Sequence, residues 1–132
     1  MKIKVLGTKE DIEKIKEDDT FLLIAFRPTR IDMIKITHNA PKLELIQMPL
    51  THQKNLAQDT LLHLRHKNIQ LINGNHWKSK NIIEPEYKIS SEILSLIKSA
   101  KENGQSIEEL KQSIPEYSQI HLQFIESLYN RI

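Results

Sequence analysis

The run Phe21-Leu22-Leu23-Ile24-Ala25-Phe26 is the strongest constraint on the fold of this 132-residue chain. It shows no alternation of apolar and polar residues, and it is shorter than a typical buried helix. Such a run predicts a strand that is buried on both faces, as strands are in parallel sheets covered by other elements. This strand therefore needs a neighbouring strand on each side and other elements packed on each of its faces.

Three further apolar runs, Lys2–Leu6, Leu43–Met48 and Ile69–Ile72, alternate with helical patterns. This alternation predicts an α/β fold with a four-stranded parallel sheet, built from flavodoxin-like βαβ units with right-handed crossovers. The doubly wound strand order 2-1-3-4 is the commonest solution and is favoured, with Lys2 projecting beyond the strand end. The order 1-2-3-4 stays open, because it centres the fully apolar run instead of the run that contains Lys2 and Lys4.

Each connection in this body carries helix signals. Thr8 begins the first helix with a box-like cap, and Pro28 lies in the first turn of the second. Ile31 and Ile34 are expected to form the inward face of that second helix. Thr51 is expected to cap one long third helix. One side of this third helix carries Leu56, Thr60, Leu61 and Leu64.

The C-terminal part shows three helix patterns. Gly104 is placed to end the first as its C′ residue, and Ser106 begins an S-x-x-E capping box for the second. After a turn at residues 115–117, Ser118 is expected to cap the last helix. Two short helices joined by a turn and preceded by a third have the outline of a helix-turn-helix.

These patterns predict a parallel α/β body at residues 1–78, a polar connection at 79–89 and a helical segment at 90–132. The last helix pattern carries more apolar side chains than two short neighbours can cover. We therefore expect it to pack against the body or a second copy, and a homodimer is the commonest closed assembly. The side chains concerned are Ile120, Leu122, Phe124, Ile125, Leu128, Tyr129 and Ile132.

Composition excludes several classes of function. The chain has no cysteine, which rules out disulfides, thiol nucleophiles and cysteine-ligated zinc. No apolar run approaches the ~18 residues of a membrane helix, and no signal-peptide pattern opens the chain, so a cytoplasmic protein without a membrane partner is expected. No Gly-rich nucleotide motif or nucleophile elbow is present, and no cofactor or metal is expected.

Ligands of open parallel sheets bind beyond the carboxyl ends of the strands. Arg27 directly follows the buried strand, and its guanidinium suits a phosphate or carboxylate beside helix N-termini. The plainer interpretation is that Arg27 pairs with Asp32. The predicted ligand-binding residues are Thr8, Arg27, Thr29, Thr51, His52, Asn75, His76 and Trp77.

A second hypothesis places DNA or RNA on the helical tail, whose last helix would enter a major groove. Residues 1–89 carry fifteen Lys and Arg against eleven acids, whereas residues 90–132 carry four against six. Because phosphate attraction needs basic residues, the body would have to add charge to the tail. The candidate nucleic-acid-binding residues are Arg65, Lys67, Lys78, Lys80, Gln119, Gln123 and Arg131.

A non-catalytic regulatory or binding protein is favoured over an enzyme, because no acid–base pair can be assigned at the loop edge. The alternative is an enzyme, or another small-molecule-binding protein, for a ligand that bears phosphate or carboxylate.

Three stretches of the chain together resemble an archaeal family of uncharacterised proteins, domain of unknown function 1699. These stretches are Leu23–Thr29 with Asp32, Ala40–Pro49 and Ile69–Trp77. The resemblance implies kinship and an archaeal origin, and it brings no established activity. Ala40–Ile46 is also similar to one βαβ unit in the substrate-side domain of D-2-hydroxyacid dehydrogenases, which implies only a flavodoxin-like sheet.

Overall fold

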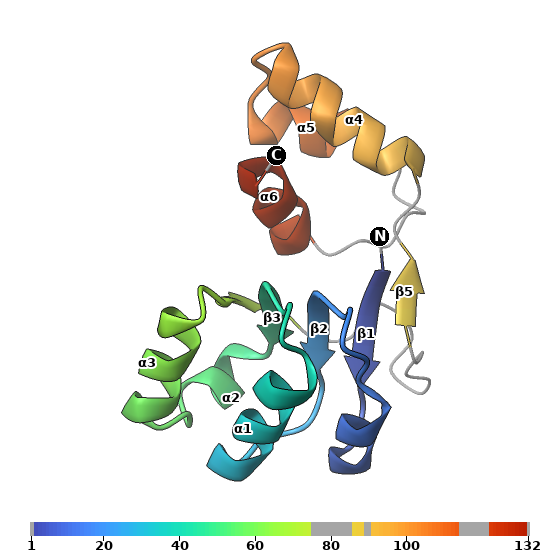
Figure 1. The fold of residues 1–132 in the computed structure, drawn as a ribbon. Helices are drawn as coiled ribbons and strands as arrows, with labels where there is room; N and C mark the ends of the chain where they lie inside the picture. The colour runs from blue at the N-terminus through green and yellow to red at the C-terminus, as the bar shows by residue number, and fades with distance from the viewer. Residues whose placement is uncertain (1, 75–85, 89–90, 114–121, 132) are drawn as a thin grey trace. The chain divides into compact units, whose positions relative to one another are not determined.

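Two compact units, residues 2–87 and residues 88–132, make up the chain in the computed structural model. The residues described are 2–74, 86–88, 91–113 and 122–131 (Figure 1). None of the helices in these ranges has the length and apolar content that crossing a lipid bilayer requires. The elements of the first unit are β1 (Lys2–Leu6), the 3-10 helix η1 (Lys9–Lys14), β2 (Phe21–Ile24), α1 (Arg30–Asn39), β3 (Leu45–Met48), α2 (Leu50–Gln53), α3 (Gln58–His66) and β4 (Gln70–Asn73). Those of the second unit are α4 (Ser91–Glu102), α5 (Ile107–Ser113) and α6 (Leu122–Arg131). The strand β5 (Glu86–Lys88) joins the two units, since its first two residues belong to the first unit and Lys88 belongs to the second.

The sheet has the strand order β4-β3-β2-β1-β5, and β1 to β4 are parallel. The predicted four-stranded parallel sheet is confirmed, but the favoured order 2-1-3-4 is wrong and the order 1-2-3-4 is correct. The physical reason is that β2 is buried at all four positions and lies between β1 and β3. The strand β5 falls inside the predicted polar connection 79–89 and was not expected there.

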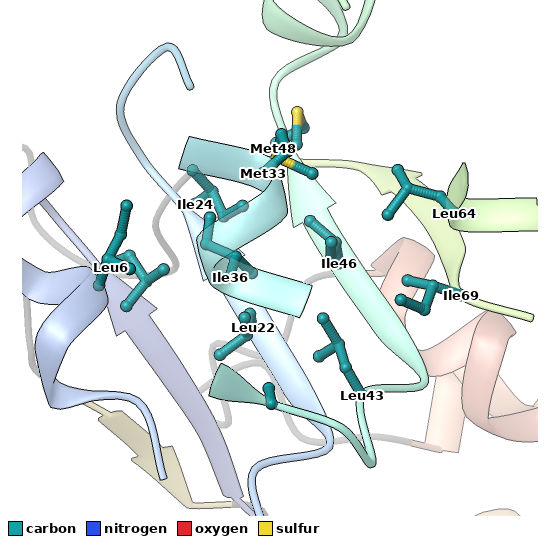
Figure 2. Packing of buried hydrophobic residues seen from close by; sticks show 12 residues of the cluster. Leu6, Leu22, Ile24, Met33, Ile36, Leu43, Ile46, Met48, Leu64 and Ile69 are labelled. Atoms are coloured by element: carbon teal, nitrogen blue, oxygen red, sulfur yellow. The ribbon is translucent and has the colours of Figure 1, made fainter. Parts of the chain in front are cut away.

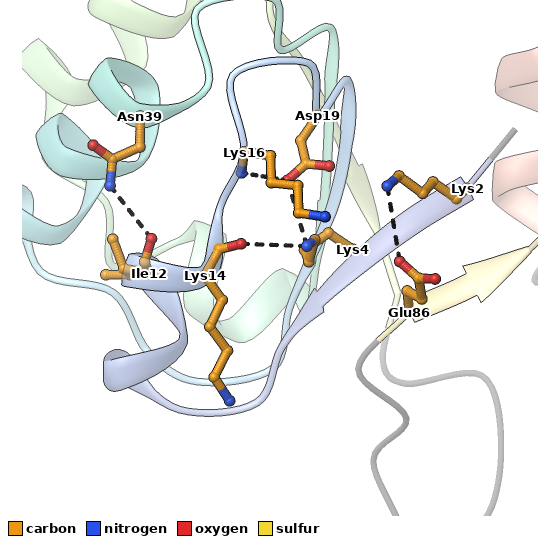
Figure 3. A network of polar contacts seen from close by, with 8 residues as sticks. All are labelled: Lys2, Lys4, Ile12, Lys14, Lys16, Asp19, Asn39 and Glu86. Carbon is orange, nitrogen blue, oxygen red and sulfur yellow. Dashed lines mark hydrogen bonds and ion pairs between the residues drawn. The ribbon is translucent and has the colours of Figure 1, made fainter.

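The lysines of β1 explain why this strand lies beside β5 and not at the centre. Lys4 Nζ lies 3.8 Å from the buried carboxylate of Asp19 and donates a hydrogen bond to the Lys14 carbonyl at 3.3 Å (Figure 3). Lys2 Nζ lies 4.0 Å from the Glu86 carboxylate on β5. The Lys4 side chain is only 12% exposed, and a buried charge is costly unless it is paired and hydrogen-bonded, so its contacts with Asp19 and the Lys14 carbonyl offset this cost. The Lys2 side chain is 38% exposed and stays in contact with water.

The connections η1, α1 and α3 pack on one face of the sheet. This follows from the strand order, since right-handed crossovers between successive neighbouring strands all pass over the same face. Figure 2 shows side chains of α1 and α3 over strand residues of that face. The cluster contains Leu6, Ile12, Leu22, Ile24, Met33, Ile36, Ala40, Leu43, Ile46, Met48, Leu64 and Ile69.

The opposite face of the central strands is buried as well. Leu23, Leu45 and Gln47 alternate with the residues of the cluster and are at most 1% exposed. Burial of β2 on both faces, as its unbroken apolar run predicts, is therefore confirmed.

The inward face of α1 differs from the expectation. Ile31 and Ile34 are 64% and 54% exposed, whereas Met33 and Ile36 are buried against the sheet. Both pairs have helical spacing and both are apolar, so periodicity alone cannot choose between them. Contact with the sheet decides which pair faces inward.

The connection between β3 and β4 also differs from the expectation. In place of one long helix capped by Thr51, it contains α2 and α3, with Pro49 and Ala57 as their N-cap residues. Thr51 lies inside α2. The third connection therefore has a second helix start, which lies within the segment expected to be continuous helix.

In the second unit, α4, α5 and α6 contact one another around Ile97, Ala100, Leu110, Ile125 and Leu128. The backbone of the C′ glycine is left-handed (Gly104, φ +72°), and the N–H of the next residue, Gln105, donates to the carbonyl of Ala100 at 2.9 Å. The cap at Ser106 is also present, since its Oγ accepts the N–H of Glu109 at 3.2 Å. The predicted turn at 115–117 and cap at Ser118 lie outside the described residues, so the helix-turn-helix outline stays a prediction.

The close approach of Gly74 to Gln47 generates a stability prediction. A Cβ at Gly74 would lie 2.0 Å from Gln47 Nε2 and 2.7 Å from its Cδ, and Gln47 is 0% exposed. We expect Gly74→Ala to lower the free energy of unfolding by about 1–3 kcal/mol because the buried amide cannot move aside freely. Urea denaturation measures this loss.

A double-mutant cycle identifies the cause. In a Gln47→Ala background the obstructing atoms are gone, so Gly74→Ala should cost clearly less there than in the natural chain. An equal cost in both backgrounds would show that the contact with Gln47 is not responsible.

Candidate functional site

Arg27 lines a pocket of about 380 Å³ at the carboxyl end of β2. One wall comes from the turn between β2 and α1, and the other from the start of α3. These walls meet because β2 and β3 are neighbours, so the connections that follow them leave the same edge of the sheet. The lining residues are Arg27, Pro28, Thr29, Arg30, Asn55, Leu56, Ala57 and Thr60.

The turn that carries Arg27 is held by a capping box. The N–H of Thr29 donates to Asp32 Oδ2 at 2.8 Å, and Thr29 Oγ1 accepts the N–H of Asp32 at 3.1 Å. Pro28 is buried and restricts the backbone just before the cap. The strand β2 ends at Ile24, so Arg27 does not follow it directly as expected; Ala25 and Phe26 lie between them. The backbone of Arg27 is held on its other side by the capped start of α1.

Asp32 is not the partner of Arg27. Its carboxylate is 1% exposed, binds Thr29, and lies 3.5 Å from Lys9 Nζ. Burial by itself raises the pKa of Asp32, but the Thr29 hydrogen bonds and the charge of Lys9 outweigh burial and hold the pKa below its ordinary value. The plainer interpretation, in which Asp32 neutralises Arg27, is not what the structure shows.

The charges around the pocket leave a positive excess. Arg27 is exposed and makes no hydrogen bond or ion pair with any residue the structure describes. Arg30 forms an ion pair with Asp59, which lies in the first turn of α3. Two guanidinium groups against one carboxylate favour an anionic ligand.

The start of α3 adds polar groups to the same pocket. Its N-cap residue, Ala57, supplies no side-chain hydrogen bond to the first N–H groups of the helix. Thr60 is 6% exposed and lines the pocket, and its hydroxyl bonds to none of the described residues. The pocket thus combines cations with hydrogen-bond donors, the set that phosphate and carboxylate oxygens require.

Thr8 belongs to a different turn and does not line this pocket. The carboxylate of Asp11 accepts the N–H groups of Gly7 and Thr8 at 2.9 and 3.1 Å and pairs with Lys14 at 3.2 Å. Burial raises the pKa of Asp11, but these hydrogen bonds and Lys14 lower it overall. A carboxylate already occupies the helix start where an anion was expected.

A second pocket, of about 450 Å³, lies between η1 and α1 and has no excess charge. Three lysines and three carboxylates line it, so it offers no net attraction for an anion. Its lining residues are Lys9, Glu10, Ile12, Glu13, Lys14, Asp32 and Lys35.

The remaining predicted residues are scattered. Thr51 and His52 lie in α2 and do not line the pocket of Arg27. Arg65 and Lys67 are exposed at the far end of α3, and Arg131 is exposed at the end of α6. Gln123 belongs to α6. Asn75, His76, Trp77, Lys78, Lys80 and Gln119 lie outside the described residues.

Sequence reasoning missed Arg30, Asn55, Asp59 and Thr60 as residues at the site. The last three were placed inside one continuous helix, where backbone N–H groups are already paired. A signal was present, because Asp59 is an acidic residue suited to the first turn of a helix. It could have indicated a new helix start after Ala57.

The pKa of Asp32 generates a pH-dependent prediction. Because the folded protein lowers this pKa below the ordinary 3.8, Asp32 contributes stability above pH 3.8 that is lost as the pH falls through the lowered value. Asp32→Asn should therefore reduce the free energy of unfolding by about 1–2 kcal/mol near neutral pH.

Chemical denaturation over a range of pH measures this effect. The difference in the free energy of unfolding between Asp32→Asn and the natural chain should shrink on acidification. The exposed control Asp18→Asn should change the free energy of unfolding little at any pH. A difference that stays constant with pH would contradict the assignment.

Comparisons with known proteins identify a family for this chain. No curated protein and no solved structure matches it. Residues 2–84 match the N-terminal domain of a family of unknown function, DUF1699, in agreement with the resemblance of its strand and turn sequences. The matched range contains every residue that lines the pocket of Arg27. The chain therefore belongs to the DUF1699 family.

Proposed function

We propose that this protein is a non-catalytic binding protein that binds a small phosphate- or carboxylate-bearing ligand in the pocket of Arg27. The observation that carries the proposal is the exposed Arg27 guanidinium, which has no partner among the described residues and stands on an anchored turn. Its planar fork of donors matches two oxygens of an anion. Such a charge-assisted contact contributes on the order of 1.5–3 kcal/mol.

The lining of the pocket supports binding in preference to catalysis. None of its eight residues is a histidine or a carboxylate. Among the residues that the structure describes, the lining therefore offers no side chain that readily takes or gives a proton near neutral pH, as general acid–base chemistry needs. An enzyme acting at this edge stays the alternative.

The charges of the tail give less support to nucleic-acid binding. Lys101 Nζ donates to the Tyr129 carbonyl at 3.1 Å and lies 4.6 Å from the centre of its ring. Lys111 pairs with Glu126. Lys101 and Lys111 are thus engaged within the tail, and contact with phosphates needs free cations. DNA or RNA binding stays a prediction that a gel-shift titration at two salt concentrations tests, and the homodimer and the archaeal origin stay predictions as well.

Substitution of Arg27 tests the proposed function. Inorganic phosphate should raise the melting temperature of the natural chain, because a ligand that binds only the folded state stabilises it. Arg27→Ala should retain its fold in the absence of phosphate and lose most of this stabilisation. Thermal melts over a phosphate titration at constant ionic strength give the measurement.

The matched control is Arg65→Ala, which removes the same charge from an exposed site at the other end of α3. It should keep the full response to phosphate. Equal responses from all three proteins would count against a site at Arg27.

A further inference from the structure

We infer that the ion pair between Arg30 and Asp59 competes with the ligand, so that the pocket prefers a dianionic phosphate monoester to a monoanion. This inference rests on the proposed function and adds a ligand class and a residue that determines specificity. Two neighbouring guanidinium groups of the pocket differ in their partners. Arg27 has no described partner, whereas Arg30 is held by Asp59.

The pair lies where the two walls of the pocket approach each other. Arg30 is the first residue of α1, and Asp59 is the second residue of α3. Arg30 itself lines the pocket, as do Ala57 and Thr60 on either side of Asp59 in the sequence. A ligand bound by Arg27 would thus lie beside a second cation that already has an anionic partner.

The exposure of the pair makes exchange of partners easy. The side chains of Arg30 and Asp59 are 65% and 47% exposed. Ion pairs this exposed contribute little to stability, because water screens them and both side chains lose freedom when they pair. A phosphate oxygen can therefore replace the Asp59 carboxylate on Arg30 at little cost.

The charge of the ligand decides whether replacing Asp59 on Arg30 is energetically favourable. One negative charge is matched by Arg27 alone, and it gains little by separating Arg30 from Asp59. A phosphate monoester carries close to two negative charges above its second pKa of about 6, which two guanidinium groups can match. The Thr60 hydroxyl, at the wall of the same pocket, is a further donor for a phosphate oxygen.

Asp59→Asn separates this idea from a simple anion site. The change keeps the size of the side chain, frees Arg30 and removes the competing charge. We expect the affinity for methyl phosphate to rise about three- to fivefold, the range that a weak surface pair allows. The affinity for dimethyl phosphate, a monoanion with the same core, should rise less. Arg30→Gln should lower the affinity for methyl phosphate and leave the affinity for dimethyl phosphate nearly unchanged.

Amide NMR titrations at about pH 8 and constant ionic strength measure these affinities and report at the same time whether each variant is folded. Asp18→Asn is the matched control, because it removes one exposed carboxylate that lies outside the pocket. Its affinity for both ligands should equal that of the natural chain.

The outcomes distinguish the two proposals. If neither ligand binds the natural chain or any variant, the proposed function is wrong, and this inference fails with it. A second outcome is that both ligands bind the natural chain while Asp59→Asn leaves the affinity for methyl phosphate unchanged or lower. In that case the inference that Asp59 competes with the ligand is wrong, and the proposed anion site is retained. If Asp18→Asn raised the affinity for methyl phosphate as much as Asp59→Asn does, the effect would come from net charge. This result would also overturn the inference that Asp59 competes with the ligand.

Discussion

Burial of β2 on both faces is the constraint on which the rest of the first unit depends. A strand of four fully buried residues needs a hydrogen-bonded neighbour on each side and cover on each face. In this chain the neighbours are β1 and β3, and the lysine-bearing β1 lies between β2 and the short strand β5. The strand order is thus the arrangement that keeps the charges of β1 out of the centre of the sheet.

The same strand order creates the pocket. Because β2 and β3 are adjacent, the turn after β2 and the helices after β3 leave the sheet side by side, and Arg27 meets the start of α3. In the order 2-1-3-4, β1 would separate these strands, and their centres would be roughly 10 Å apart instead of about 5 Å. The turn after β2 would then lie one strand further from the helices after β3.

Electrostatics at the carboxyl edge separates this pocket from its surroundings. The carboxylates of Asp11 and Asp32 occupy the starts of η1 and α1, where they accept backbone N–H groups. The start of α3 has no side-chain cap, and its nearby acid, Asp59, pairs with Arg30. The first turn of α1 is thus capped by side chains close to Arg27, whereas the first N–H groups of α3 have no side-chain cap.

The sequence by itself determined the features that depend on local chemistry. These are the apolar runs that form β1 to β4, the two-sided burial of β2, the cap at Ser106 and the left-handed Gly104, because each depends on residues close together in the chain. Arg27 as the cation after the buried strand was also predictable. Only the tertiary structure decided the strand order, the stripe of α1 that faces the sheet, the break between α2 and α3, and the residues that share a pocket with Arg27. These depend on contacts between segments far apart in sequence, where several arrangements satisfy the same local pattern and only the burial of charge and apolar surface selects among them.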